Sequence, residues 1–271
     1  DGYCINESII RKAKEDRIDT IVTCDNRISA LAQVRLAKEL GMTVIVTDHH
    51  EVPYTEENGN KEYHLPPADV VVDPKQSADT SHFKGICGAL IAYKLIEALC
   101  EKSGEEEKKK SLQKELLPFA ALATVCDVME LRDENRIIVK YGMQQMKETE
   151  NPGLLALLQV NDLMDKELSP YHAGFILGPC LNATGRLDSA DRALRLFEET
   201  DFKKAVTEAY DLKSLNDSRK QMTEDGVSEA VRMLEAEGRE QDPVLVVYLP
   251  DCHESIAGII AGRLKEKYHK P

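Results

Sequence analysis

Near the start of the chain, two apolar runs typical of β-strands flank a segment with helical spacing of its apolar residues. Two short runs rich in β-branched residues, at 20–24 (TIVTC) and 43–47 (TVIVT), predict β-strands. Between them, residues 29–40 carry apolar side chains at helical spacing, and Gly41 ends that helix. A strand, a helix and a second strand in this order predict a βαβ unit with parallel strands and a right-handed crossover.

The segments around this unit extend it into a larger domain. Residues 8–14 and 88–100 have helical spacing, and residues 69–72 form a third short β-type run. Residues 52–67 contain Pro, Gly and Asn among polar residues, which predicts a loop. Residues 112–160 are expected to be largely helical. The N-terminal part is therefore expected to be a parallel sheet with helices around it.

The second half of the chain begins with a long polar pattern. Residues 190–238 form an almost unbroken amphipathic stretch, and a helix this polar usually bridges two domains. A buried-type strand at 244–248 (VLVVY) and a helix at 256–268 follow it, and one strand with one helix cannot bury a core. The predicted fold class is α/β: a parallel-sheet domain over 1–188, a long connecting helix over 189–240, and the start of a second, truncated α/β domain over 241–271.

Composition limits the kind of function. The chain has 35 Lys and Arg against 48 Asp and Glu, a formal charge of −13, which opposes general attraction to nucleic acid or to anionic membranes. A phosphate-containing substrate would therefore need a local cationic site or a bound metal ion. The seven cysteines are odd in number and never form a Cys-x-x-Cys pair, which supports neither a disulfide framework nor a zinc ribbon.

No targeting or membrane segment is evident in the sequence. No apolar run approaches the roughly 20 residues that span a bilayer, and the first residues resemble neither a signal peptide nor a transit peptide. We expect a soluble cytoplasmic protein without a membrane partner. The chain has no initiator Met, so we also expect these residues to be the interior of a longer polypeptide.

Residues with chemical potential follow the first two predicted strands. Asp25 comes directly after the first strand, and Asp48, His49 and His50 follow the second. Ligands bind beyond the carboxyl ends of strands in open α/β sheets, so these groups are expected at one edge, where they could share a divalent metal ion. The pattern alone also fits ordinary turn residues. Asp127 ends an apolar run and is either a helix cap or a buried carboxylate, and periodicity does not choose between them.

Five segments of the chain resemble the signatures of one enzyme family. Residues 21–26 (IVTCDN), 46–50 (VTDHH) and 123–128 (ATVCDV) are similar to three successive signatures of the DHH phosphoesterases. Residues 178–187 (GPCLNATGRL) and 253–263 (HESIAGIIAGR) resemble the RecJ branch of that family, the single-strand-specific 5′→3′ DNA exonucleases of repair and recombination. Together the signatures extend over nearly the whole chain in the same order.

The resemblance implies a phosphodiesterase that uses two divalent ions, Mn²⁺ or Mg²⁺, in the intact protein. By position, Asp25, His49 and Asp127 resemble the family's metal ligands. Asp48 would orient its neighbours, and His50 would face the scissile phosphate. Two divalent ions activate water and neutralise the charge of the transition state in such hydrolysis.

The later signatures imply substrate contacts. Asn182 and Arg186 resemble a substrate-binding pair, and His253 and Arg263 are implied as phosphate contacts, since an Arg side chain binds phosphate through two parallel hydrogen bonds. Each could instead be a solvated residue near a helix end. The implied partner is single-stranded DNA, with single-strand-binding protein and a helicase as further candidate partners.

Two departures and two alternatives accompany the resemblance. The family's first signature, a pair of aspartates, would precede Asp1, and its later parts would follow Pro271, so we expect the 271 residues alone to cleave DNA poorly. A phosphodiesterase for short oligonucleotides or cyclic dinucleotides would share the fold. A non-catalytic replication scaffold would tend to lose the ligands Asp25, His49 and Asp127, which are all present here.

Overall fold

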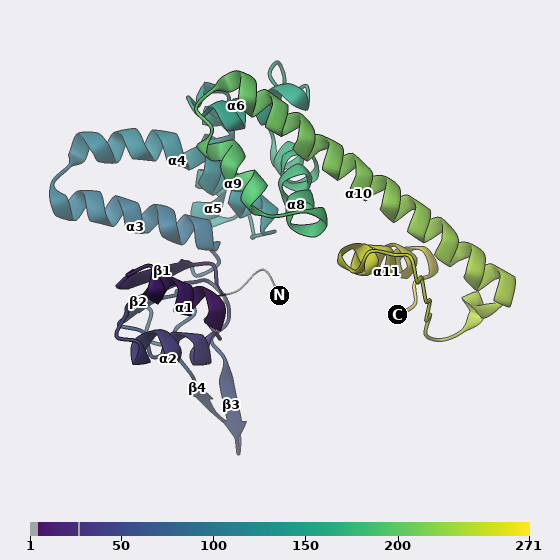
Figure 1. The fold of residues 1–271 in the computed structure, drawn as a ribbon, viewed down its shortest axis with the longest axis horizontal. Helices are drawn as coiled ribbons and strands as arrows, with labels where there is room; N and C mark the ends of the chain where they lie inside the picture. Colours follow the sequence, from purple (N-terminus) through teal and green to yellow (C-terminus); the bar gives the residue numbers. More distant parts are fainter. Residues whose placement is uncertain (1–4, 27) are drawn as a thin grey trace. The chain divides into compact units, whose positions relative to one another are not determined.

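The computed structural model describes residues 5–26 and 28–271, and the chain divides into two compact units. The first unit is Asp1–Thr149 and the second is Glu150–Pro271. Both are drawn in Figure 1, with the first unit in purple to teal and the second in green to yellow. The first unit contains the sheets and the second is helical.

A small parallel sheet forms the start of the first unit. Its strands are β1 (Thr20–Cys24), β2 (Thr43–Thr47) and β5 (Val70–Val72), in the order β1-β2-β5. Both strands of the predicted βαβ unit are confirmed at the expected bounds, and they pair in parallel with Thr20 opposite Thr43. Helices α1 (Glu7–Glu15) and α2 (Leu31–Glu39) lie beside this sheet.

The core beside this sheet follows the apolar spacing of the sequence. Ile10 of α1 and Ala37 of α2 are fully buried, and they cluster with Val44 and Val46 of β2. Val44 and Val46 are two residues apart on the strand, so their side chains lie on the same face of the sheet. Because β2 pairs in parallel with both β1 and β5, the carboxyl ends of the three strands lie at a common edge.

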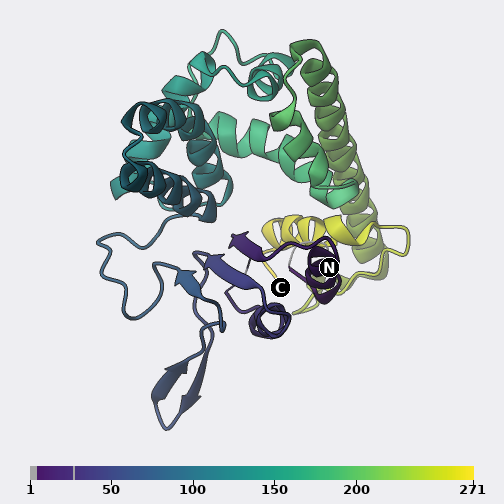
Figure 2. The ribbon, with the colours of Figure 1, turned by 60° about the vertical axis from the view of Figure 1, so that its left-hand side comes forward.

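A β-hairpin lies within the segment that was expected to be a loop. Strands β3 (Tyr54–Glu57) and β4 (Asn60–Tyr63) pair antiparallel, so the predicted loop at 52–67 is wrong over these residues. Asn58 and Gly59 connect them with φ angles of 53° and 80°, as a tight hairpin turn requires. All eight strand residues are exposed, and the hairpin extends away from the parallel sheet in Figures 1 and 2. The hairpin therefore lacks the apolar face by which a strand is usually recognised in a sequence.

Three long helices complete the first unit. They are α3 (Gly88–Ser103), α4 (Glu106–Cys126) and α5 (Asp133–Gln145), followed by the short η1 (Met146–Glu148). Helices α4 and α5 pack closely because residue 142 is a glycine: a Cβ there would lie 2.3 Å from the Cβ of Ala121 and 2.7 Å from the carbonyl oxygen of Leu117. Helix α4 ends at Cys126 and places Asp127 at its C-terminal cap.

The second unit packs around one long helix. Helix α10 (Phe202–Glu237) contacts α6, α8 and α11 along its length. The remaining elements of this unit are α6 (Pro152–Val160), α7 (Pro170–His172), η2 (Ala173–Leu177), α8 (Gly178–Leu187), α9 (Asp191–Glu198), η3 (Arg239–Gln241) and α11 (Glu254–Tyr268). Small residues of α10, including Ala205 and Ala209, are fully buried, which lets the neighbouring helices approach.

Two expectations about this unit need correction. The predicted continuous helix at 190–238 is broken at residues 199–201, where the side chain of Asp201 caps the start of α10. Residues 244–248 form no strand, and Val246 and Tyr248 are 64% and 77% exposed, because none of the described strands pairs with them. The second α/β domain is thus not seen: the described elements of residues 150–271 are all helices. The expected boundaries at 188/189 and 240/241 stay a prediction.

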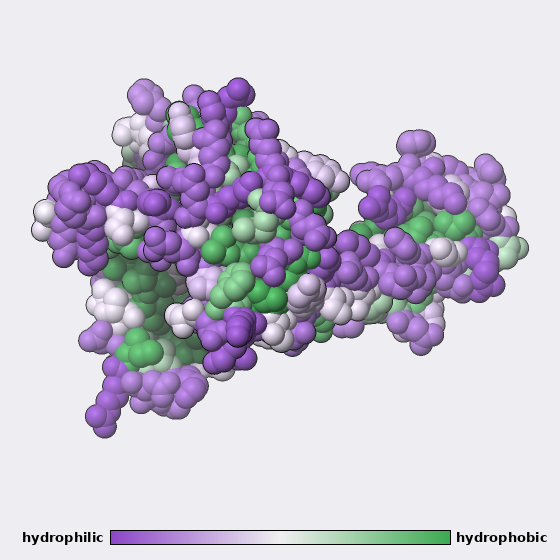
Figure 3. All heavy atoms as spheres, turned by 90° about the horizontal axis from the view of Figure 1, so that it is seen from above, coloured by the Kyte–Doolittle hydropathy of each residue, from purple (hydrophilic) through white to green (hydrophobic). Residues whose placement is uncertain are grey.

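Surface and cysteine chemistry agree with the composition. On the face drawn in Figure 3, hydrophilic side chains cover most of the surface, as the net charge of −13 leads one to expect. Among the described residues, no helix has the length and hydropathy to cross a membrane. None of the six described cysteines forms a disulfide with another of them, and Cys87, Cys100 and Cys180 are buried as small apolar side chains.

Candidate metal centre

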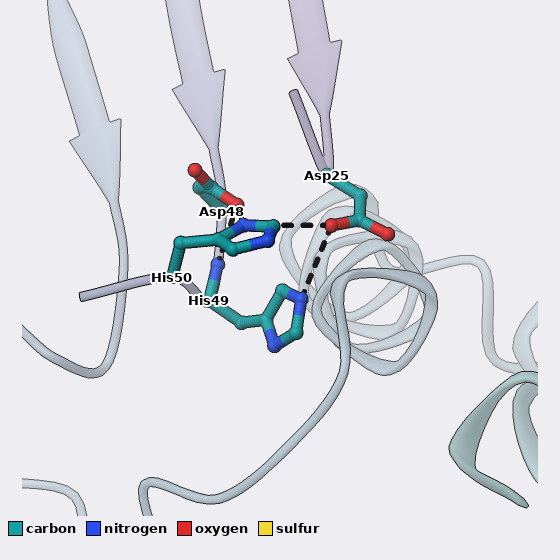
Figure 4. A group of neighbouring side chains, drawn as sticks. All are labelled: Asp25, Asp48, His49 and His50. Carbon is teal, nitrogen blue, oxygen red and sulfur yellow. Dashed lines mark hydrogen bonds and ion pairs between the residues drawn. The ribbon is translucent and has the colours of Figure 1, made fainter. Parts of the chain in front are cut away.

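The carboxyl ends of β1 and β2 carry the central residues of the candidate site. Asp25 follows β1, and Asp48, His49 and His50 follow β2, as Figure 4 shows. The backbone amide of Asp25 donates to the carbonyl of Thr47 (3.1 Å), which continues the ladder one residue beyond the strands. Ligand atoms of the four residues lie within 4.8 Å of one another. The expected convergence at one sheet edge is confirmed.

Asp48 is fully buried and organises the residues around it. Its Oδ1 accepts hydrogen bonds from the backbone amide of His49 (2.8 Å) and from Nδ1 of His50 (2.8 Å), and its Oδ2 accepts one from the amide of Ile28. Because Nδ1 of His50 carries the donated proton, Nε2 is the atom that a neutral His50 leaves available as an acceptor. These contacts support an orienting role for Asp48.

His49 connects Asp25 with Asp127. Its Nε2 donates to Oδ1 of Asp25 at 3.1 Å and lies 3.5 Å from Oδ2 of Asp127, which comes from the end of α4. The imidazole is nearly buried, whereas the two carboxylates are about half exposed. Of the two interpretations of Asp127, the structure shows the helix cap, and that cap position places the carboxylate at the sheet edge. Two carboxylates from separate elements thus share one imidazole nitrogen.

The electrostatics of this group favour positive charge. The hydrogen bond from His49 lowers the pKa of Asp25, and the same bond raises the pKa of His49. Burial raises the pKa of Asp127, because the charges of His49 and His50 do not fully offset the cost of removing this carboxylate from water. Asp127 also stands at the negative end of the dipole of α4, which disfavours an anion and favours a cation nearby.

The backbone around the site is unusual at two positions. Asp25 has a φ of 55° and Val128, next to Asp127, a φ of 57°; the second is rare for a β-branched residue. Gly88, at the start of α3, lies against Asp25: a Cβ there would be 2.5 Å from the Cβ of Asp25. Sequence reasoning missed Gly88, because a lone glycine at a helix start gives no sign of what approaches it.

The donor set fits a divalent cation such as Mn²⁺ or Mg²⁺. Asp25 and Asp127 offer carboxylate oxygens and His49 offers an imidazole nitrogen, the ligand types that these cations bind in proteins. The Nε2 proton of His49 now lies between the two carboxylates, where a cation would satisfy the same three atoms. The assignment of these residues as metal ligands stays a prediction, and the chemistry of the group supports it.

The remaining predicted site residues lie in the second unit. Arg186 of α8 donates from Nη1 to the carbonyl of Ser255 (2.7 Å), and His253 caps α11 through Nδ1, which accepts from the amide of Ser255 (3.3 Å). Arg263 of α11 is exposed and lies 3.6 Å from Glu266. Asn182 of α8 is exposed as well. Arg186 and His253 thus meet at the start of α11.

Sequence reasoning did not identify two further residues, Arg219 and Asp73. Arg219 of α10 lines a surface pocket of about 580 Å³ together with Arg263, and burial together with the charges of Arg186 and Arg263 lowers its pKa. It is one of many basic residues on a polar helix, so spacing could not single it out. Asp73 follows β5 as Asp25 follows β1. The rule that ligands bind beyond parallel strands could have found it.

Residues 3–124 match the family described as "DHH family, N-terminal domain". This part of the chain is therefore similar to the DHH family. The sheet, Asp25, the Asp48-His49-His50 triplet and helices α1 to α3 all fall inside this DHH match, and Asp127 follows three residues after it.

Relatives of known activity extend beyond the DHH domain. The whole chain is 35% identical over 271 residues to the single-stranded-DNA-specific exonuclease RecJ of Bacillus subtilis and covers 32% of that protein. It is 34% identical over 281 residues to the RecJ of Escherichia coli and covers 47% of it. The chain thus spans between a third and a half of the length of these relatives.

Solved structures give the same fold. A crystal structure of exonuclease RecJ bound to manganese matches with a TM-score of 0.82 and 27% identity, over 100% of this chain and 64% of that one. The structure of RecJ in complex with Mn²⁺ from Thermus thermophilus matches with a TM-score of 0.77 and 28% identity, over 97% of this chain and 37% of that one. The coarse fold, a small parallel sheet with many helices, is therefore RecJ-like.

Proposed function

We propose that this chain is the phosphodiester-cleaving part of a 5′→3′ single-stranded-DNA exonuclease that works with two divalent ions in the intact protein, Mn²⁺ or Mg²⁺. The convergence of Asp25, His49 and Asp127 within hydrogen-bonding distance at the sheet edge carries the proposal. The relatives support it, since they are named single-stranded-DNA-specific exonucleases and two solved neighbours contain manganese.

Each residue of the candidate centre has a separate task in this proposal. Asp25, His49 and Asp127 hold the cation, which supplies Lewis-acid stabilisation of the charge that develops on the phosphate. Asp48 fixes the ring of His50 through Nδ1, so that Nε2 is presented to the substrate. Because Asp48 makes three hydrogen bonds inside the protein, it orients its neighbours and is not itself a ligand.

Residues of the second unit bind the sugar–phosphate backbone in this proposal. Arg186, Arg219 and Arg263 form a cationic group on a chain with a net charge of −13, and Asn182 and His253 add polar contacts. A local cationic group of this kind allows an acidic protein to bind a polyanion. Single-strand-binding protein and a helicase remain proposed partners, and no described residue is assigned to them.

The test is nucleotide release from a labelled single-stranded oligonucleotide in Mn²⁺. We expect little release by the 271 residues alone and rapid release by a version extended at both ends to the length of the relatives. In the extended version, Asp25→Asn should abolish release. An Asn at position 25 keeps the size of the side chain and removes its charge.

The other outcomes separate the alternatives. Activity confined to dinucleotides or cyclic dinucleotides would favour a phosphodiesterase for short substrates. Binding of DNA without any cleavage by the extended protein would favour the non-catalytic scaffold. Release from 3′ ends would overturn the proposed polarity, and equal release by the Asp25→Asn variant would overturn the proposed centre.

A further inference from the structure

Three neighbouring strands each end in an aspartate. Asp25 follows β1, Asp48 follows β2 and Asp73 follows β5. The register pairs Thr47 with Val72, and the amide of Asp48 donates to the carbonyl of Val72 (3.0 Å), so the ladder continues beyond the strands. Neighbouring strands lie about 4.8 Å apart, so the three aspartates form a row across one edge of the sheet. The three strand ends are visible together in Figure 4.

Asp73 is buried, and only one of its two carboxylate oxygens has a hydrogen-bond partner among the described residues. The residue is 2% exposed, and its Oδ1 accepts a hydrogen bond from the amide of Lys75 at 2.7 Å. Its Oδ2 is buried and has no hydrogen-bond partner among the described residues. Buried carboxylates are normally paired or fully hydrogen-bonded. An unpaired buried oxygen beside a candidate cation site therefore calls for an explanation.

The charge of Asp73 interacts with the charges of Asp48 and His49, and Asp73 forms no ion pair among the described residues. Burial raises the pKa of Asp73 to about 6; the charge of Asp48 adds to this rise, whereas the backbone hydrogen bond from Lys75 and the charges of His49 and Lys75 oppose it. At pH 8 the carboxyl is therefore ionised. The ammonium of the nearby Lys75 is held by Glu51 at 2.7 Å, so it does not form an ion pair with Asp73.

We propose that Asp73 is a positioning residue of the cation site: its buried charge strengthens the binding of a divalent cation by Asp25, His49 and Asp127, although Asp73 is not itself a ligand. Replacing a residue that supports the ligands without binding the metal typically changes metal affinity by about 10- to 100-fold. The inference rests on the part of the proposed function that assigns a divalent cation to this site.

The experiment measures the Kd for Mn²⁺ of the 271-residue protein at pH 8, from the electron paramagnetic resonance signal of free Mn²⁺. Asp73→Asn keeps an oxygen for the amide of Lys75 and removes the charge, so we expect the Kd to rise about tenfold. The matched control is Glu62→Gln, which removes one charge from an exposed side chain of β4 in the same unit. Solvent screens that charge, so its loss should change the Kd by less than about twofold.

Thermal unfolding separates this role from a structural one. Without Mn²⁺, Asp73→Asn should melt at the same or a higher temperature than the wild type, because it removes an unpaired buried charge. With Mn²⁺ present, the rise in Tm should be smaller than in the wild type. Asp73→Ser also retains an oxygen near the amide of Lys75 and serves as a second variant should Asp73→Asn fail to fold.

Each outcome decides the question. Wild-type protein that binds no Mn²⁺ would contradict the assignment of a divalent cation to this site, and this inference with it. Wild-type binding with an unchanged Kd in Asp73→Asn would contradict the inference alone. A lower Tm without Mn²⁺, or failure of both variants to fold, would show that Asp73 serves the fold instead.

Discussion

Replacement of Gly88 by alanine should damage both the fold and the cation site. The added Cβ would lie 2.5 Å from the Cβ of Asp25, 2.8 Å from its Cγ and 3.1 Å from its Cα. Carbon atoms pack best at about 3.5–4.0 Å, so either α3 or Asp25 must move by roughly 1 Å. Asp25 now lies 3.1 Å from His49, and a shift of that size breaks the hydrogen bond.

The expected magnitude follows from overpacking. Forcing an extra methyl group into a packed contact costs about 1–3 kcal/mol of unfolding free energy. Urea unfolding followed by circular dichroism measures this loss, and a Mn²⁺ titration measures the effect on the site. We expect the Kd for Mn²⁺ to rise by roughly tenfold or more, since a carboxylate displaced by about 1 Å no longer matches the other ligands.

The matched control is Gly258→Ala in α11. No atom lies within 4 Å of the Cβ that this substitution adds, and alanine favours a helix over glycine by about 1 kcal/mol. Gly258→Ala should therefore leave stability unchanged or raise it. If Gly88→Ala unfolds within about 0.5 kcal/mol of the wild type and binds Mn²⁺ equally well, the close contact with Asp25 has no functional meaning.

Three further predictions address packing, charge and substrate binding. Gly142→Ala should lower the unfolding free energy by about 1–3 kcal/mol through overpacking between α4 and α5, with the Mn²⁺ Kd of the folded protein unchanged in the same titration. In the cation-free protein the hydrogen bond to Asp25 raises the pKa of His49 above its ordinary value of 6.5, so His49 stabilises the fold most below pH 6.5 and less as the pH rises through its folded pKa. The stability difference between wild type and His49→Gln, measured by urea unfolding, should shrink over that range; a difference that grows with pH would contradict this sign. Arg263→Ala should weaken binding of a fluorescent single-stranded oligonucleotide and leave Tm nearly unchanged, because this side chain is 66% exposed, whereas a lower Tm with intact binding would make it structural.

The sheet and part of the candidate site could be predicted because both depend on local pattern. The runs at 20–24 and 43–47 are rich in β-branched residues, and they form β1 and β2 without a change of bounds. Parallel strands end at one edge, so the meeting of Asp25 with the Asp48-His49-His50 triplet followed from the order of elements.

The rest depended on contacts that no local pattern contains. The hairpin of β3 and β4 has no apolar face, so its residues were indistinguishable from a polar loop. Residues 244–248 show the opposite case, because an apolar β-type run forms a strand only where another strand is available to pair. Gly88 and Asp73 gain their significance from neighbours more than 20 residues away, which a single sequence does not reveal.

The most direct test of the central claim is anomalous diffraction from crystals of the protein grown with Mn²⁺. We predict an anomalous peak at the edge of the parallel sheet, roughly 2–2.5 Å from a carboxylate oxygen of Asp25, an oxygen of Asp127 and Nε2 of His49. The hydrogen bond that now joins His49 to Asp25 would be replaced by the cation. Well-ordered side chains of these three residues with no peak between them, in crystals that show Mn²⁺ elsewhere, would contradict the account.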